Sequence, residues 1–138
     1  MRLVLDTNIL ISALITKGTP PDLLYQGWQD GRFLLITSAV QLAEIERVVE
    51  YPRLKPLIKT YEVQLLIAGL HRKAIVASDL PEVSYSPDPT DNKIIATAIA
   101  GYADYLVSGD RSHLLRLQKI GGMPVITARR AWEIMEGR

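Results

Sequence analysis

The chain has 138 residues with 16 basic and 15 acidic side chains, so its formal net charge is +1 with both histidines neutral. Hydrophobic residues make up 48% and charged residues 22% of the chain, a composition that excludes intrinsic disorder and is typical of a globular domain with a sizeable core. The near-neutral charge argues against a dedicated basic clamp for DNA or RNA, because affinity for phosphate depends on a cationic excess. We therefore expect one domain over residues 1–138, with any role in nucleic-acid chemistry confined to a local site.

The sequence contains no cysteine, which excludes disulfides, thiolate nucleophiles, cysteine-based zinc sites and iron–sulfur clusters. Near the amino terminus, Asp6 follows only three consecutive apolar residues, which is wrong for the core of a signal peptide. No apolar run approaches the length of a membrane span. We expect a cytoplasmic protein that does not insert into membranes.

Short apolar runs bounded by turn residues alternate with segments of helical periodicity along the whole chain. The runs predicted as strands are residues 3–5, 33–36, 74–77, 105–107 and 125–126. The predicted helices are, in chain order, one that begins near Asn8, one from Thr19–Pro20 to Gly31, one from Thr37–Ser38 to about Pro52, a short and a longer one between Arg53 and Arg72, one from Thr90 to Tyr102, one from Asp110 to Leu117 and one capped by Thr127. Because parallel strands need crossover connections, this alternation predicts an α/β fold with a mostly parallel sheet covered by helices on both faces.

Four of the fifteen acidic residues stand out by their positions. Asp6 ends the first predicted strand, and Asp110 lies three residues after Val107 at the end of the fourth, so both emerge at the same edge of a parallel sheet. Asp91 starts the apolar, inward-facing row of the helix that it opens, and Glu44 lies on a partly apolar stripe of its helix. Ligands of open parallel sheets sit outside the carboxyl ends of the strands, which makes these acids the candidates for a site.

Helix capping is the alternative role for most of these acids. Asp6 and Asp110 each precede a predicted helix and could serve as its cap. Asp88 is interpreted as an N-cap, because a proline follows it at the first helical position and Asp91 stands at the third. Glu44 has the weakest capping alternative, since it lies about six residues beyond its cap.

Carboxylates crowded at one sheet edge repel one another unless a cation neutralises them. With no cysteine and no histidine pair, oxygen ligation favours Mg²⁺ or Mn²⁺ over zinc. One or two such ions could activate a water and stabilise the charge that builds on a phosphodiester. We therefore predict a metal-dependent phosphodiesterase whose catalytic and metal-binding residues are Asp6, Glu44, Asp91 and Asp110.

The same residues carry a family resemblance. Four segments resemble the motif blocks of the PIN domain, and in particular its toxin branch related to the VapC-type toxins of toxin–antitoxin systems: Leu3–Asn8, Ser38 with Glu44, Asp88–Lys93 and Tyr105–Arg111. They occur in the family's order and span nearly the whole chain. The resemblance implies an α/β/α sandwich with a five-stranded parallel sheet. It also implies a Mg²⁺- or Mn²⁺-dependent endoribonuclease, usually a homodimer, that a cognate antitoxin protein inhibits.

Carried over residue by residue, the family's acidic quartet falls on the four acids that the spacing selects. The resemblance assigns supporting roles to Asn8, which would position an acid or a water, and to Ser108, which stands where many members have threonine or serine. Lys93 and Arg111 flank the acids and could hold phosphate, with pairing to neighbouring carboxylates as the alternative. Asp88 belongs to this branch's third block but is not a general family ligand, which agrees with its interpretation as an N-cap.

Histidine and tryptophan receive structural interpretations. His71 stands at a helix end and is expected at the surface, where the helix dipole favours positive charge. His113 lies one turn after Asp110 and is interpreted as a surface histidine, with metal ligation as the alternative. Trp28 and Trp132 are expected in the core or in a dimer interface, because neither lies in a basic, aromatic-rich stretch.

Two other functions remain as alternatives to the nuclease. One is a catalytically weak scaffold of the same fold that binds RNA or a partner, against which the intact quartet argues. The other is a Mg²⁺-dependent aspartyl-phosphate receiver or phosphatase with Asp79 as its phosphoacceptor. Asp6-Thr7-Asn8 lacks the second aspartate of such a site, and Thr127-Ala128 replaces the lysine expected after the fifth strand.

Overall fold

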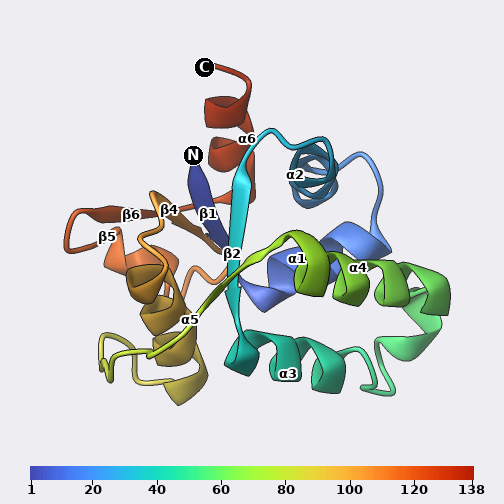
Figure 1. The fold of residues 1–138 in the computed structure, drawn as a ribbon, viewed down its shortest axis with the longest axis horizontal. Helices are drawn as coiled ribbons and strands as arrows, with labels where there is room; N and C mark the ends of the chain where they lie inside the picture. Colours follow the sequence, from blue (N-terminus) through green and yellow to red (C-terminus); the bar gives the residue numbers. More distant parts are fainter.

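A computed structural model describes residues 1–138 (Figure 1). Its elements are, in chain order, β1 (Arg2–Leu5), α1 (Thr7–Ile15), α2 (Pro20–Gln29), β2 (Leu34–Ser38), α3 (Ala39–Val48), the 3₁₀ helix η1 (Lys55–Leu57), α4 (Thr60–Lys73), β3 (Ile75–Ala77), α5 (Pro89–Ala100), β4 (Tyr105–Val107), the 3₁₀ helix η2 (Leu115–Leu117), β5 (Lys119–Ile120), β6 (Met123–Ile126) and α6 (Ala128–Met135). The predicted α/β fold is confirmed.

The sheet has six strands in the order β3-β2-β1-β4-β6-β5. All neighbouring strands are parallel except β5 and β6, which form an antiparallel pair. The predicted mostly parallel sheet is therefore confirmed, with six strands where the resemblance implies five and one antiparallel pair at an edge. The reason lies in the turn Gly121-Gly122, which joins the paired residues Ile120 and Met123 and has φ +60° at Gly121, so that the chain doubles back as a hairpin.

The strands bury side chains on both faces of the sheet, and alternate residues serve the two faces. Leu3 and Leu5 of β1 belong to the larger core, whereas Val4 between them belongs to the smaller one. The larger core contains buried residues of α1, α2, α3, α4 and α6, and the smaller core contains those of α5 and of the segment after β4. The molecule is thus a three-layer α/β/α sandwich, as the sequence predicts.

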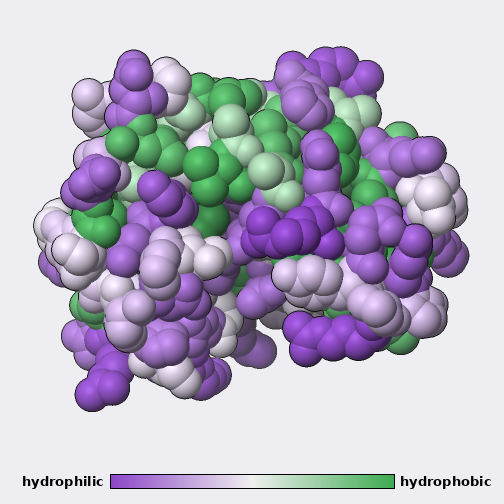
Figure 2. Space-filling view, turned by 90° about the horizontal axis from the view of Figure 1, so that it is seen from below, coloured by the Kyte–Doolittle hydropathy of each residue, from purple (hydrophilic) through white to green (hydrophobic).

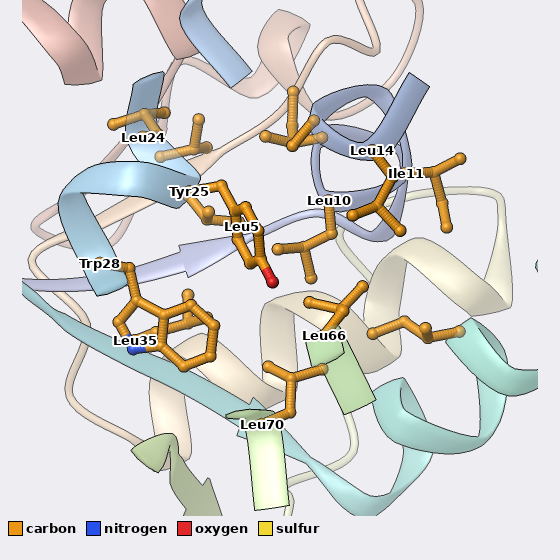
Figure 3. Close-up of a cluster of buried hydrophobic side chains, with 14 of the residues drawn as sticks. Leu5, Leu10, Ile11, Leu14, Leu24, Tyr25, Trp28, Leu35, Leu66 and Leu70 are labelled. Atoms are coloured by element: carbon orange, nitrogen blue, oxygen red, sulfur yellow. The ribbon is translucent and has the colours of Figure 1, made fainter. Parts of the chain in front are cut away.

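The larger core packs strand residues against helices from distant parts of the chain. Figure 3 shows part of this core. Leu5 of β1 and Leu35 of β2 lie in one cluster with Trp28 of α2. Leu66 and Leu70 of α4 belong to the same cluster. Trp28 is 3% exposed, and the ammonium of Lys73 lies 5.4 Å from its ring centroid. The expectation that Trp28 is a core residue is confirmed, while Trp132 is partly buried and packs against the same core.

Several helix starts follow the predicted capping residues. The hydroxyl of Ser38 accepts a hydrogen bond from the backbone N–H of Gln41 at 3.3 Å, and that of Thr127 accepts one from Arg130 N–H at 3.1 Å. The carboxylate of Asp88 accepts one from Thr90 N–H at 2.9 Å, which confirms its interpretation as the N-cap of α5.

The helix expected from Asp110 to Leu117 is wrong. The segment forms turns and ends in the single 3₁₀ turn of η2, after which Gln118 has φ +62°. Two features hold this segment in place of helical hydrogen bonds: the Asp110 carboxylate, which accepts two backbone hydrogen bonds, and the fully buried side chain of Leu114.

No helix is both long enough and apolar enough to span a membrane. In Figure 1, the two chain termini lie in the upper part of the molecule, β1 and β2 run downward, and β2 leads into α3 at the bottom. Figure 2 looks onto the molecule from below, at the side toward which these strands run, and hydrophilic side chains predominate in the lower half of that view.

Candidate active site

The order of the strands places a crevice at the carboxyl ends of β1 and β4. From β1 the chain moves outward through β2 to β3, and it then crosses to the other side of β1 to form β4. Such a change of direction leaves the loops after the two central strands on opposite sides of a crevice, where ligands of open α/β sheets bind. The residues that follow these strands are Asp6 and Ser108.

Asp6 and Ser108 lie side by side because the register of the two strands continues into them. Leu5 pairs with Val107, and the backbone N–H of Asp6 donates to the carbonyl of Val107 at 2.8 Å. The Ser108 hydroxyl donates to Asp6 Oδ2 at 3.1 Å. Asp6 stands at the N-cap position of α1, but its side chain makes no capping bond, so the capping alternative is wrong for this residue.

Glu44 is brought to the same edge by α3. The side-chain NH₂ of Gln41 donates to the backbone carbonyl of Leu5 at 2.7 Å, and the side-chain Oε1 of Gln41 accepts a hydrogen bond from the Thr37 hydroxyl at 2.7 Å. These buried bonds tie the first turn of α3 to the end of β1. Glu44, one turn further along, accepts a hydrogen bond from the hydroxyl of Thr7, the first residue of α1.

Asp91 is held by a serine that the sequence analysis did not single out. The hydroxyl of Ser86 donates to Asp91 Oδ2 at 2.8 Å and accepts a hydrogen bond from Asp88 N–H at 3.1 Å. The side chain of Asn92 bonds both the N–H and the carbonyl of Ser86, at 2.9 Å each. The signal in the sequence was the run Ser86–Asn92, in which two prolines and several short polar side chains favour local side-chain to backbone bonds.

Asp110 combines a capping role with a place in the site. Its Oδ1 accepts hydrogen bonds from the backbone N–H groups of Ser112 at 3.0 Å and His113 at 3.2 Å, so this oxygen holds a turn in place of the helix that Asp110 was expected to cap. Its own N–H donates to the Ser108 hydroxyl at 3.0 Å. Oδ2 lies 3.5 Å from Nδ1 of His113, and the same nitrogen lies 3.8 Å from Oδ2 of Asp91.

The structure therefore brings the predicted acids to one sheet edge in two adjoining groups. Asp91 and Asp110, together with His113, offer ligand atoms within 4.8 Å of one another. Asp6 adjoins this group through Ser108, which bonds both Asp6 and Asp110, and Glu44 stands beside Asp6. The side chain of His113 is 42% exposed, as expected of a surface histidine, and it also faces two acids. His71 is exposed in the last turn of α4, as expected.

Burial and mutual repulsion perturb the acids of this edge. Burial raises the pKa of Asp6 from 3.8 to about 6, the Ser108 hydroxyl opposes this rise, and the charges of Glu44 and Asp91 add to it. Burial likewise raises the pKa of Asp91, against the effect of its hydrogen bond from Ser86. Both carboxylates are thus less stable as anions than in water.

The supporting residues named from the sequence differ in their surroundings. Ser108 is fully buried between two acids. Asn8 is exposed and forms no side-chain hydrogen bond within the chain, and it is the preceding residue, Thr7, that contacts Glu44. Lys93 and Arg111 are exposed and form no ion pair with a protein carboxylate, which disfavours simple charge pairing as their role.

A groove of about 220 Å³ between α3 and α5 leads away from Glu44. Its wall carries two cationic side chains, Arg47 of α3 and Lys93 of α5, and apolar surface from Val40 and Ile94. The sequence analysis missed Arg47, whose position one turn after Glu44 places it on the same face of α3. The groove thus joins the acidic edge to a surface that suits a phosphate-bearing chain.

Comparison with known proteins identifies the family of the chain. The family model of the PIN domain matches residues 2–112. This chain belongs to the PIN domain family, which confirms the resemblance stated from the four motifs. A search of curated protein sequences finds no match.

Two solved structures are similar to this chain at low sequence identity. VapBC2 from Rickettsia felis, solved bound to a DNA fragment from its promoter, has 17% identity and a TM-score of 0.55, with 92% of this chain and 98% of that chain covered. FitAcB from Neisseria gonorrhoeae has 16% identity and a TM-score of 0.49, with the same coverage. At this identity the likeness to VapBC2 establishes the fold.

Proposed function

We propose that this protein is a metal-dependent endoribonuclease and the toxin component of a toxin–antitoxin pair. The observation that carries the proposal is the gathering of Asp6, Asp91 and Asp110, with Glu44 beside them, at the carboxyl ends of β1 and β4. Membership of the PIN domain family supports a nuclease. The aspartyl-phosphate receiver has no such support, and its phosphoacceptor Asp79 lies exposed after the edge strand β3.

The donor set fits a hard divalent cation. Asp6 and Asp91 are buried carboxylates whose pKa values are raised first by burial and further by the charges of neighbouring acids. We assign the ion to Asp91, Asp110 and Asp6, with Glu44 completing the site directly or through water. A bound Mg²⁺ or Mn²⁺ would supply positive charge and Lewis acidity at a phosphodiester.

The residues around the acids hold them in place for this role. The Ser108 hydroxyl bonds both the Asp6 carboxylate and the backbone N–H of Asp110. The hydroxyl of Thr7 orients Glu44, and that of Ser86 orients Asp91. These hydrogen bonds orient the carboxylates before any cation or substrate binds, which reduces the conformational entropy that binding must cost.

Substrate binding is assigned to the cations near the acids. Lys93 and Arg47 line the groove that leads from Glu44, and Arg111 follows Asp110 directly. None of the three is engaged in an ion pair with a protein carboxylate. We propose that they contact the phosphates on either side of the scissile bond, so that a protein of net charge +1 binds RNA through a local cationic surface.

The toxin role rests on the resemblance of the four motif blocks to VapC-type toxins, and the fold shared with the VapBC2 structure accords with it. It implies a cognate antitoxin protein as inhibitor and a homodimer as the functional unit. Sequencing of the flanking DNA for a small adjoining reading frame, co-expression of any such frame with this chain and purification of both chains test the antitoxin. Light scattering of the purified chain tests the second.

The central experiment measures cleavage of single-stranded and structured RNA by tag-free protein with Mn²⁺, with Mg²⁺ and with EDTA. Cleavage that requires the metal and is lost in Asp6→Asn and Asp91→Asn is the expected result. Asp30→Asn is the matched control, because Asp30 is an exposed aspartate at the end of α2, outside the site. Cleavage by the folded Asp6→Asn variant in EDTA would contradict the proposal. Metal-dependent RNA binding without cleavage would favour the catalytically weak scaffold.

A further inference from the structure

The acidic edge contains a nitrogen donor that oxygen-only ligation does not account for. Of the two histidines in the chain, only His113 faces the acids. Its Nδ1 lies 3.5 Å from Asp110 Oδ2 and 3.8 Å from Asp91 Oδ2. One imidazole nitrogen is thus directed toward two carboxylates from different elements, one on α5 and one after β4.

These distances differ from those of a direct hydrogen bond. A charge-assisted N–H···O bond is about 2.7–2.9 Å long. Both separations from Nδ1 exceed that range, and neither pair forms a hydrogen bond. By contrast, ligands of one octahedral ion at about 2.1 Å lie about 3 Å apart in adjacent positions and about 4.2 Å apart in opposite ones. The separations of 3.5 and 3.8 Å fall between these two values.

The backbone fixes the imidazole near the free oxygen of Asp110. His113 N–H donates to Asp110 Oδ1 at 3.2 Å, so one oxygen of that carboxylate holds the turn on which the histidine stands. The other oxygen, Oδ2, faces the ring. Asp91 Oδ2 is in turn positioned by the Ser86 hydroxyl at 2.8 Å. All three donors are therefore oriented by bonds that do not involve the proposed ion.

We infer that Nδ1 of His113 is a ligand of the divalent ion, together with Asp91 and Asp110. The inference rests on the proposed function for the existence of a metal site and adds the nature of its donors. A set that includes an imidazole nitrogen favours Mn²⁺ and the later first-row ions over Mg²⁺, which prefers oxygen. The site is therefore selective for transition metals, in contrast to the oxygen-only site that the sequence predicts.

Pulsed electron paramagnetic resonance of Mn²⁺ bound to tag-free protein tests the inference, because it detects a ¹⁴N nucleus coordinated to the ion. The wild-type protein should show this coupling, and His71→Ala should retain it. His113→Ala and His113→Gln should lose it while keeping the unfolding curve of the wild type in EDTA. Calorimetric titration of the same proteins should show Mn²⁺ affinity falling about tenfold or more in both His113 variants, and Mg²⁺ affinity falling less.

The outcomes separate the two proposals. Mn²⁺ that binds the wild-type protein without ¹⁴N coupling, and equally well in His113→Ala, would overturn the role of His113 and leave the metal-dependent nuclease intact. Absence of Mn²⁺ binding to the wild-type protein would overturn both. Loss of coupling in His71→Ala with retention in His113→Ala would place the ion elsewhere in the fold and also overturn the inference.

Discussion

Replacement of Asp6 by asparagine should stabilise the metal-free protein. Burial and the neighbouring acids raise the pKa of Asp6 from 3.8 to about 6, so the ionised form is disfavoured in the folded state. A pKa difference of one corresponds to about 1.4 kcal/mol, so ionised Asp6 destabilises the fold by about 3 kcal/mol. Asparagine has the same shape, carries no charge and can still accept the hydrogen bond from Ser108.

The effect has a defined dependence on pH. Between about pH 4 and pH 6 the folded protein binds more protons at Asp6 than the unfolded chain does, so stability falls as the pH rises through this window. Above pH 6 the full destabilisation by ionised Asp6 is present, and below pH 4 this destabilisation is absent. Asp6→Asn should therefore exceed the wild type by about 3 kcal/mol at pH 8 and by nearly nothing at pH 4.

Urea unfolding of both proteins in EDTA, across pH 4 to 8, measures this difference. Added Mn²⁺ should then stabilise the wild type more than the variant, because the ion neutralises a charge that only the wild type carries. Asp30→Asn serves as the control, since Asp30 is exposed. A variant that is equal to or less stable than the wild type at pH 8 in EDTA would refute the reasoning.

Three further changes have expected outcomes. Ser108→Ala removes the buried hydroxyl that donates to Asp6 and accepts from a backbone N–H, so it should cost about 1–3 kcal/mol in urea unfolding and raise the pKa of Asp6 further, followed by NMR titration. Gly101→Ala places a Cβ in steric clash with a methyl of Ile36, so it should lower stability by about 1–3 kcal/mol in the same assay. Lys93→Ala should raise the KM for RNA, leave kcat nearly unchanged and weaken the salt dependence of binding.

Each of these predictions has a contradicting result. Unchanged stability in Ser108→Ala would mean that its two hydrogen bonds are replaced by water. A neutral Gly101→Ala would mean that β2 and α5 can separate without cost at this point. A fall in kcat with constant KM in Lys93→Ala would assign that side chain to the chemical step instead of to substrate binding.

Local patterns predicted the strands and helices whose signals lie within a few residues. The apolar runs of β1 and β4 and the caps Ser38, Asp88 and Thr127 are properties of short segments, so they could be identified before any packing was known. The prediction of a helix from Asp110 to Leu117 was wrong, because the side-chain hydrogen bonds of Asp110 and the burial of Leu114 outweigh a weak helical propensity. The sequence did not predict β5 and its hairpin with β6, because a strand of two residues has no periodicity to detect.

The sequence by itself determined which acids gather at one edge of the sheet. Asp6 and Asp110 follow apolar strands, and Asp91 and Glu44 lie on inward-facing rows of helices, so the period of each element places them at one sheet edge. Only the tertiary structure decided which donors approach one another. His113 could not be separated from a surface histidine, because its orientation depends on Asp91, which lies 22 positions earlier in the chain. Distances between residues on different elements follow from strand order and packing, which no local pattern contains.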